Sequence, residues 1–359
     1  MLKLNKPTSL ILAALTSSLL LSGCGSEPSG LALGEERVDP HEAREAIEMA
    51  ELIRKVSFDR ARERKPIKRF NQIKTNGCVE GEFKVKGGLP NDLAQGIFKR
   101  SKSFKATMRF ANASEMDDTA ADFRGLAIKI HVDDSDSYTE KDGQTEQDFL
   151  FNSQPALFAA DPKVFHEFIK ATDSGNLASF AMGNIGATWS LLMGRDNPDS
   201  MFEVDFFSTT PSRLGHATKT AVKYSVQACE KAPDYPLDRN DANYLRQSMI
   251  EHLRVKDACF NFMVQKQTNP DTMPIEDASV EWPESESPFV TVATITVKAQ
   301  NFIAHDKMAA CEAMTFSPWN GFVDHKPLGG INRVRKAIYE QLGDFRNDLN
   351  NELSEGAEY

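Results

Sequence analysis

Cysteine and histidine are scarce in this chain, whose 359 residues include five cysteines and seven histidines. No cysteine falls in a Cys-x-x-Cys pair or a Cys/His cluster, so a structural metal site is not expected. The apparent zinc-protease motif at His166 and Glu167 is incomplete, because Lys170 stands where the second histidine ligand belongs. We expect the scattered histidines to be surface or capping residues rather than ligands: His131, His216, His252, His305 and His325.

Basic residues are also in short supply. The chain has 42 lysines and arginines against 52 acidic residues, which gives a formal charge of −10. Such a surface repels phosphates, so nucleic acid is not an expected partner. Gly183 and Gly186 lack the Gly-Lys-Ser/Thr sequence that binds phosphate, and we expect a bend or a close packing contact there.

The N-terminus carries a secretory pattern. Two lysines precede an apolar run over residues 10–21, which is too short to span a membrane, and Leu-Ser-Gly-Cys follows at 21–24. We predict a lipoprotein signal peptide over residues 1–23, with Cys24 acylated as the first mature residue. Gly25 follows the cysteine, as in outer-membrane lipoproteins of bacteria, so we expect a lipid anchor on the periplasmic face of the outer membrane. The alternative is an ordinary signal peptide with an incidental cysteine.

Cleavage of the signal would remove both lysines and leave a formal charge of −12, with four cysteines besides the acylated Cys24. In the oxidising cell envelope these cysteines could form two disulfides, and sequence alone leaves all three pairings open. Four small buried thiols are the alternative. The cysteines concerned are Cys78, Cys229, Cys259 and Cys311.

The remaining chain divides into a flexible tether over residues 24–38, rich in Gly, Ser, Pro and Glu, and one domain over residues 39–359. Apolar spacing predicts helices over 41–65, 161–172, 176–193, 241–256 and 332–351. It predicts strands over 79–85, 106–111, 126–132, 148–158, 220–228 and 289–299, with a polar loop over 133–147. Locally paired strands followed by interleaved helices indicate an α+β fold, an antiparallel sheet or barrel with helices packed outside.

Arg335 and Tyr339 stand four residues apart in the last predicted helix, which stacks a guanidinium over a phenol on one helix face. A neighbouring cation that donates hydrogen bonds favours the ionised phenol. A phenolate is a strong ligand for ferric iron and one of the known axial ligands of haem. The same spacing also arises by chance on surface helices, so the pair needs support from elsewhere in the chain.

Two segments of the chain resemble the paired strands of haem catalases. Residues 108–111 and 122–129 are similar to that family's Val-Arg-Phe-Ser and Asp-Pro-Arg-Gly-Phe-Ala-Val-Lys. Residues 155–162, with Phe165 and Phe168 beyond them, look like the catalase stretch whose phenylalanines cover the distal face of the haem.

Two further segments continue the resemblance in order. Residues 69–72 take the place of the family's Arg-x-x-His, and residues 335–339 that of its Arg-x-x-x-Tyr, with Arg346 seven residues beyond. The chain is most similar to a short bacterial subgroup of catalase-like proteins, whose ends resemble residues 316–320 and 325–333. The resemblance implies a catalase-like antiparallel β-barrel with surrounding helices, and haem b buried between the barrel and the C-terminal helix.

The resemblance also assigns residues to the cofactor. Tyr339 would be the axial ligand of the haem iron, supported by Arg335, and Phe158 and Phe165 would cover the distal face. Two propionates need cationic partners when they are buried. Those partners would be Arg69, Arg109 and Arg346. Without the resemblance, each arginine would be interpreted as a solvated surface residue and Tyr339 as a buried core tyrosine.

The departures from the family concern the face opposite the tyrosine. Gln72 stands at the position of the distal histidine, and an amide cannot accept and return a proton as that histidine does. The serine that orients the histidine is Ala111 here. The distal asparagine falls at Ser153 in an ungapped reading, or at Asn152 with a one-residue shift, and either side chain can hold a peroxide oxygen by a hydrogen bond.

These residues together predict a haem-binding, catalase-like lipoprotein that acts on hydrogen peroxide or organic hydroperoxides. General acid and base catalysis contributes roughly 10²–10⁴-fold, so we expect weakened catalase turnover and residual peroxidase-type oxidoreductase chemistry. A lipid anchor would bring fatty-acid hydroperoxides within reach. The alternative is a non-enzymatic envelope protein that binds haem, or that uses an empty catalase scaffold to bind another partner.

Overall fold

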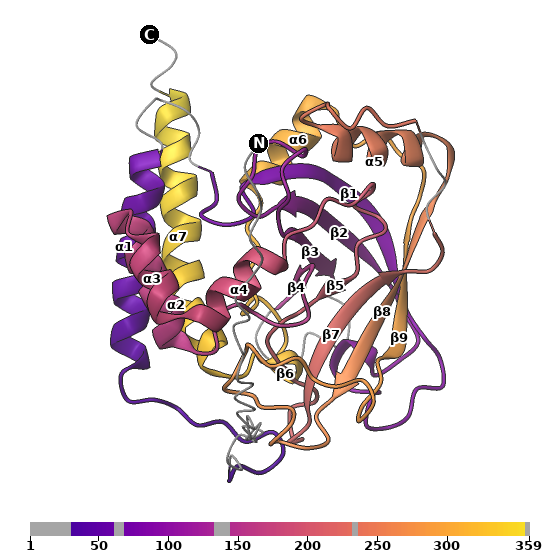
Figure 1. Ribbon diagram of the computed structural model, residues 1–359. Helices are drawn as coiled ribbons and strands as arrows, with labels where there is room; N and C mark the ends of the chain where they lie inside the picture. Colours follow the sequence, from indigo (N-terminus) through magenta and orange to yellow (C-terminus); the bar gives the residue numbers. More distant parts are fainter. Residues whose placement is uncertain (1–29, 61–67, 133–143, 232–235, 356–359) are drawn as a thin grey trace, which may run out of the picture.

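The computed structural model describes residues 30–60, 68–132, 144–231 and 236–355, and over these residues nine strands form one antiparallel sheet (Figure 1). The sheet order is β5-β4-β3-β2-β1-β9-β8-β7-β6. The strands are β1 (Lys74–Val85), β2 (Ser103–Asn112), β3 (Arg124–His131), β4 (Glu146–Asn152), β5 (Phe206–Phe207), β6 (Ser212–Arg213), β7 (Ala221–Ala228), β8 (Ala258–Lys266) and β9 (Val290–Val297). The predicted signal peptide and Cys24 lie outside the described residues.

Two short pairings close the sheet into a barrel. Phe207 of β5 pairs with Asn152 of β4, and Phe206 pairs with Val226 of β7. Within the described residues, eight strands therefore form the closed wall, while the two-residue strand β6 pairs with β7 beside β5. Closure pairs the outermost strands with each other, which is how a barrel avoids exposed strand edges.

Side chains alternate along the wall between a packed interior and an outer face. On β2, Met108 and Phe110 belong to the interior core, so Arg109 and Ala111 belong to the outer face. Aromatic rings in mutual contact fill much of the interior: Phe83, Phe98, Phe149, Tyr224 and Phe262. The outer face is the one that the helices cover.

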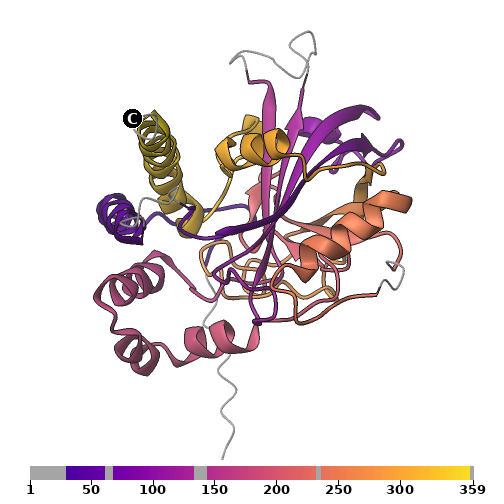
Figure 2. The ribbon, with the colours of Figure 1, turned by 90° about the horizontal axis from the view of Figure 1, so that it is seen from above.

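Helices stand beside one part of this outer face (Figure 2). α1 (Glu42–Arg60), α2 (Pro162–Ser174) and α7 (Gly330–Glu355) pack on one another around a second apolar cluster. The cluster is formed by Ala46, Met49, Ala50, Ile53, Ile169, Val334 and Ile338. The remaining helices are α3 (Leu177–Gly183) and α4 (Ile185–Met193), which follow α2, and α5 (Tyr244–Val255) and α6 (His305–Ala313), which contact β1.

The predicted antiparallel barrel with helices packed outside is confirmed. The strand predicted over 148–158 ends at Asn152, three residues before Pro155, which cannot donate a ladder hydrogen bond. The helix predicted over 41–65 is present to Arg60, and residues 61–67 lie outside the described part of the chain. Of the predicted loop over 133–147, residues 133–143 also lie outside it.

The helix predicted over 176–193 is interrupted at Asn184, which separates α3 from α4. The bend expected at Gly183 and Gly186 is therefore present. The close packing contact is not, because a Cβ atom added to either glycine would meet nothing within 4 Å.

Two disulfides resolve the pairing that the sequence left open. Cys78 is bonded to Cys311, and Cys229 to Cys259, with Cα–Cα distances of 6.1 and 5.3 Å. The first bond joins β1 to α6 across 233 residues of sequence. It fixes α6 against the outer face of the barrel.

Two of the histidines expected to be surface or capping residues are buried, and each lies in the last turn of a helix or 3-10 turn. His325, in the short 3-10 turn η2 (Val323–His325), is 3 % exposed, and His252 is 5 % exposed. His325 lies inside a ring of aromatic side chains and accepts a hydrogen bond from the amide of Ile97 in η1 (Gly96–Phe98). Among the described residues, none of the helices has both the length and the apolar character needed to cross a membrane.

Candidate functional site

Arg335 and Tyr339 meet on α7 as their spacing predicts. Arg335 Nη2 lies 3.1 Å from the phenol oxygen of Tyr339, and its Cζ lies 5.2 Å from the centroid of the phenol ring. The ring of Tyr339 is half-buried against the apolar cluster of α1, α2 and α7. The guanidinium therefore fixes the orientation of the phenol oxygen on this face of α7.

A buried amide holds this arginine in position. Asn332 Oδ1 accepts from Arg335 Nη1 at 3.2 Å, while its Nδ2 donates to the backbone carbonyls of Pro211 and Leu328 at 2.9 Å each. Thr210 donates its hydroxyl to the same Oδ1 at 3.1 Å. Asn332 therefore links the segment just before β6 to the helix that carries the tyrosine.

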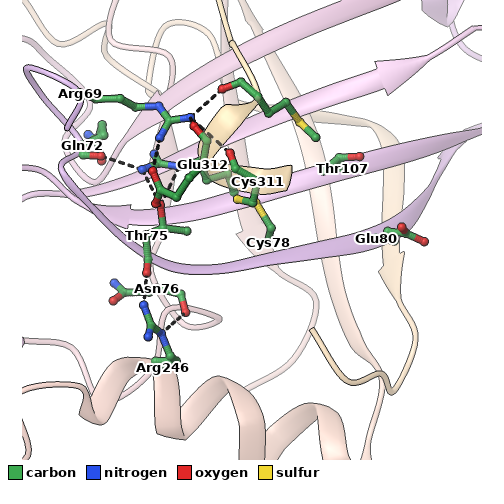
Figure 3. The surroundings of a disulfide bond; sticks show 12 residues. Arg69, Gln72, Thr75, Asn76, Cys78, Glu80, Thr107, Arg246, Cys311 and Glu312 are labelled. Atoms are coloured by element: carbon green, nitrogen blue, oxygen red, sulfur yellow. Dashed lines mark hydrogen bonds and ion pairs between the residues drawn. A yellow bond between two sulfur atoms is a disulfide. The ribbon is translucent and has the colours of Figure 1, made fainter. Parts of the chain in front are cut away.

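The three predicted propionate arginines gather around the C-terminal end of α6. Figure 3 shows one of them, Arg69, beside Glu312 and Thr75. Arg69 Nη1 is 2.8 Å from Glu312 Oε2, and Arg346 Nη1 is 2.6 Å from the backbone oxygen of Glu312. Arg109 donates to Thr75 Oγ1 at 2.8 Å, and Thr75 in turn donates to the Glu312 carboxylate. Four segments distant in sequence thus meet around one carboxylate.

The electrostatics of this arginine cluster favour further anions. Burial and the nearby charge of Arg69 lower the pKa of Arg109 to about 9 and that of Arg346 to about 10. Burial opposes ionisation of Glu312, but the Arg69 charge and the Thr75 hydrogen bond outweigh it and lower the pKa of that carboxyl. The cluster has three guanidiniums and one carboxylate, so it suits a ligand with two negative charges.

Opposite α7, a row of residues crosses the outer face of the barrel. Thr75, Ala111, Gly125 and Asn152 are direct cross-strand partners on β1, β2, β3 and β4, so they share one face. The side chain of Gln72 lies over Gly125, where a Cβ atom would come within 2.4 Å of all three atoms of its amide group.

Gln72 is held in an unusual way. Its φ of 60° is in the left-handed region that few non-glycine residues occupy, and its backbone amide donates to the Ala113 carbonyl at 2.9 Å. Its buried Oε1 has no hydrogen-bond partner within the described part of the chain. A buried acceptor of this kind can bind a donor such as water or a hydroperoxide O–H.

Of the two alternatives for the distal asparagine, Asn152 lies in the cross-strand row. The hydroxyl of Ser153 accepts from the backbone amide of Arg124 at 3.0 Å, so it serves the joint between β3 and β4. The structure therefore brings Gln72 and Asn152 to the same surface and engages Ser153 elsewhere. Their predicted catalytic roles stay predictions.

The predicted phenylalanines gather beside the tyrosine. Phe158 contacts Phe168 with a centroid distance of 4.8 Å and Phe165 with one of 6.1 Å. Phe165 and Phe168 pack against the same apolar cluster as Tyr339. The phenylalanines and the Tyr339 phenol therefore lie around the same apolar cluster, and their predicted roles toward a haem stay predictions.

Sequence reasoning missed Thr75, Glu312 and Asn332. Thr75 is the direct partner of Ala111, because a bulge between Thr75 and Gly77 moves the register of β1 by one residue, from Asn76 to Thr75. Arg246 of α5 donates to the backbone oxygen of Thr75 and holds this bulge. The three-residue spacing of Asn332 and Arg335 on one helix face was the one signal available for this set.

No protein-family model matches the sequence, and no curated protein matches it either. Solved structures do match. Catalase A from Saccharomyces cerevisiae has a TM-score of 0.60 and 16% identity, over 81% of this chain and 63% of the yeast chain. A bacterial catalase has a TM-score of 0.59 and 16% identity, over 96% of this chain and 67% of that one.

A fungal catalase has a TM-score of 0.60 and 15% identity, over 83% of this chain and 63% of its own. This chain therefore spans just under two thirds of the length of the yeast and fungal catalases that it matches. Identities this low establish the fold and leave the chemistry to the site residues. The chain has a catalase-like fold.

Proposed function

We propose that this chain binds haem b and acts on peroxides. The observation that carries the proposal is the gathering of three arginines around Glu312: Arg69 pairs with its carboxylate, Arg346 donates to its backbone oxygen, and Arg109 donates to Thr75, which bonds to the carboxylate. They lie beside a helix whose Tyr339 receives a hydrogen bond from Arg335. Arg69 also lies within electrostatic range of the Tyr339 phenol. Anion-binding groups and an iron ligand are thus combined at one site.

Each residue has a defined task in this proposal. The arginines would bind the propionates, Tyr339 would ligate the iron, and Arg335 would orient the phenol by donating to its oxygen. When bound, haem would supply iron-centred redox chemistry with peroxides. The phenylalanines around Phe158 would exclude water from the ring edge.

The distal residues favour slow turnover. Gln72 and Asn152 can orient a peroxide by hydrogen bonds, but neither changes its charge near neutral pH. Proton transfer would then depend on water, and the roughly 10²–10⁴-fold contribution of a general base would be lost. Peroxidase-type turnover is therefore favoured over rapid dismutation of hydrogen peroxide.

A single titration tests haem binding and the axial ligand. Purified protein given ferric haem should show a tyrosinate-type absorption spectrum, and Tyr339→Phe should change it. Tyr244→Phe on α5 is the matched control, because this phenol donates to the backbone of Pro198 and should leave the spectrum unchanged. A protein that takes up no haem, or an unchanged Tyr339→Phe spectrum, would contradict the proposal and favour the apo-scaffold alternative.

Oxygen evolution from hydrogen peroxide tests the distal assignment. Gln72→His should raise the rate at least about tenfold, because a titratable ring then occupies the cradle over Gly125. Thr75→His tests the alternative that Thr75 occupies the distal position, since Thr75 is the direct cross-strand partner of Ala111. A gain in Thr75→His alone would move the distal position to Thr75, and high turnover in the unchanged protein would refute a weakened site.

Organic hydroperoxides are the second candidate substrate class. Exposed apolar side chains cover α3 and α4, and Phe180 of α3 contacts Phe168 of the aromatic wall at 5.5 Å. An apolar surface that continues into the site suits an acyl chain better than hydrogen peroxide. A lipid anchor at Cys24, on the periplasmic face of the outer membrane, would keep such substrates nearby. A higher kcat/KM for a fatty-acid hydroperoxide than for hydrogen peroxide is the expected result.

A further inference from the structure

The C-terminal end of α6 uses the hydrogen-bond donors of two cofactor-binding arginines. Arg69 Nη2 donates to the backbone oxygens of Met314 at 2.7 Å, Glu312 at 3.3 Å and Cys311 at 3.4 Å. Arg346 donates to the backbone oxygens of Glu312 and Met314. The last carbonyls of a helix carry a partial negative charge, so this end of α6 acts as an anion toward the cluster.

Glu312 adds a full carboxylate to these carbonyls. It bonds to Arg69 and Thr75, in the way that a propionate would on the same donors. Its side chain is 34% exposed, whereas that of Arg69 is 16% exposed, so the carboxylate lies on the solvent side of the pair. It could therefore leave toward water without crossing the core.

The Cys78–Cys311 disulfide is the main anchor of α6. Cys311 is the only buried residue of this helix, and it directly precedes Glu312. Figure 3 shows the disulfide and the Glu312 carboxylate on the same short segment, beside Arg69 and Thr75. A covalent link at the adjacent residue keeps the effective concentration of the carboxylate at the arginines high.

We propose that Glu312 is a built-in competitor for the haem propionates, held over the arginine cluster by the Cys78–Cys311 disulfide. The inference rests on the proposed haem binding. In the free protein Glu312 neutralises part of the buried positive charge, and an incoming porphyrin carboxylate must displace it from Arg69. Haem binding then exchanges one carboxylate for another, which lowers the affinity and slows the association.

Equilibrium titration of the full chain with ferric haem tests the competition. Glu312→Gln should lower the Kd roughly tenfold, because the exchange is no longer needed. Asp306→Asn, at the other end of α6, is the matched control and should leave the Kd unchanged. With haem dimethyl ester, which lacks the carboxylates, Glu312→Gln should give no gain.

Removal of the Cys78–Cys311 disulfide tests whether this bond holds Glu312 over the arginines. The double variant Cys78→Ser/Cys311→Ser should bind haem faster, and hydrogen exchange over residues 305–314 should rise in the haem-free protein. Cys229→Ser/Cys259→Ser removes the other disulfide and should change neither quantity. Circular dichroism of each variant, before haem is added, confirms that the fold is retained.

The outcomes separate this inference from the proposed function. If the unchanged chain binds haem and Glu312→Gln binds it equally or more weakly, the competition by Glu312 is overturned. The proposed haem binding then still stands. An equal gain for haem and its dimethyl ester also overturns the competition. If Glu312→Gln binds haem and the unchanged chain does not, the competition by Glu312 is supported. If no variant binds haem, both proposals are contradicted.

Discussion

His325 is a residue whose protonation state is fixed by its hydrogen bonds. Its Nε2 accepts from the backbone amide of Ile97 at 3.0 Å and must therefore be unprotonated. Its Nδ1, 2.9 Å from the hydroxyl of Tyr224, then carries the proton. Burial lowers the pKa of His325 to about 4, although the nearby Asp324 charge opposes that shift. The neutral ring is part of the barrel core.

This histidine should make the protein unstable in acid. Its pKa is near 6.5 when unfolded and about 4 when folded, so the unfolded chain binds the extra proton between these values. The contribution of neutral His325 to the free energy of unfolding is complete above its pKa in the unfolded chain. About 3 kcal/mol of it is lost as the pH falls to the pKa in the folded protein. Urea unfolding across that range measures it. His325→Gln, which can accept but not titrate, should flatten the slope, and an equal slope would contradict the assignment.

The sequence predicted those site residues whose geometry is local. The helix repeat sets the contact of Arg335 and Tyr339, and strand alternation sets the outward direction of Arg109. Glu312 could not be predicted in this way, because 243 residues separate it from Arg69. The left-handed backbone conformation of Gln72 could not be predicted either, since it depends on tertiary contacts rather than on residue type.

Between elements, Arg333 joins α7 to three other parts of the chain. It donates to Glu42 of α1 at 2.7 Å, to Glu36 of the preceding segment at 2.6 Å and to Glu276 at 2.8 Å. Its side chain is 17% exposed, and the paired carboxylates raise its pKa despite burial. Since α7 carries Tyr339, this network sets the position of the predicted iron ligand.

Loss of that cation should loosen α7. Arg333→Met leaves three partly buried carboxylates without their shared partner, and we expect a loss of about 2–3 kcal/mol in the free energy of unfolding. Arg44→Met on α1 is the matched control, because its 3.7 Å pair with Glu48 is exposed and should contribute less than about 0.5 kcal/mol. Equal losses in a urea titration would mean that Arg333 is an ordinary surface charge.

Most long elements with clear apolar periodicity were predictable, with the nine-residue β8 as an exception, and the two-residue strands were not. The strands over 106–111, 126–132 and 220–228 are found within two or three residues of their predicted ends. β5, β6, β8 and α6 were missed. β5 and β6 have two residues each and exist only through pairing with β7, and α6 buries a single residue. For these elements the decisive contacts are tertiary.

At the scale of the whole molecule, one surface departs from the acidic character of the chain. No charged residue occurs between residues 176 and 194, and α4 has no buried residue. Figure 2 shows α2, α3 and α4 beside the barrel, on the same side as α1 and α7. The exposed apolar side chains are Leu177, Met182, Ile185, Trp189, Leu192 and Met193.

The acidic chain should avoid anionic lipids, so this surface should bind zwitterionic bilayers by apolar insertion. In a Cys24→Ser background, which removes the anchor, phosphatidylcholine vesicles should shift the fluorescence of Trp189 to the blue, because this side chain is 63% exposed in the free protein. Leu192→Asp should weaken vesicle binding about tenfold. Val255→Asp, at an exposed apolar residue of α5, should not change it. Equal binding by both variants would leave the predicted lipid anchor as the only membrane contact and remove the structural support for lipid hydroperoxides as substrates.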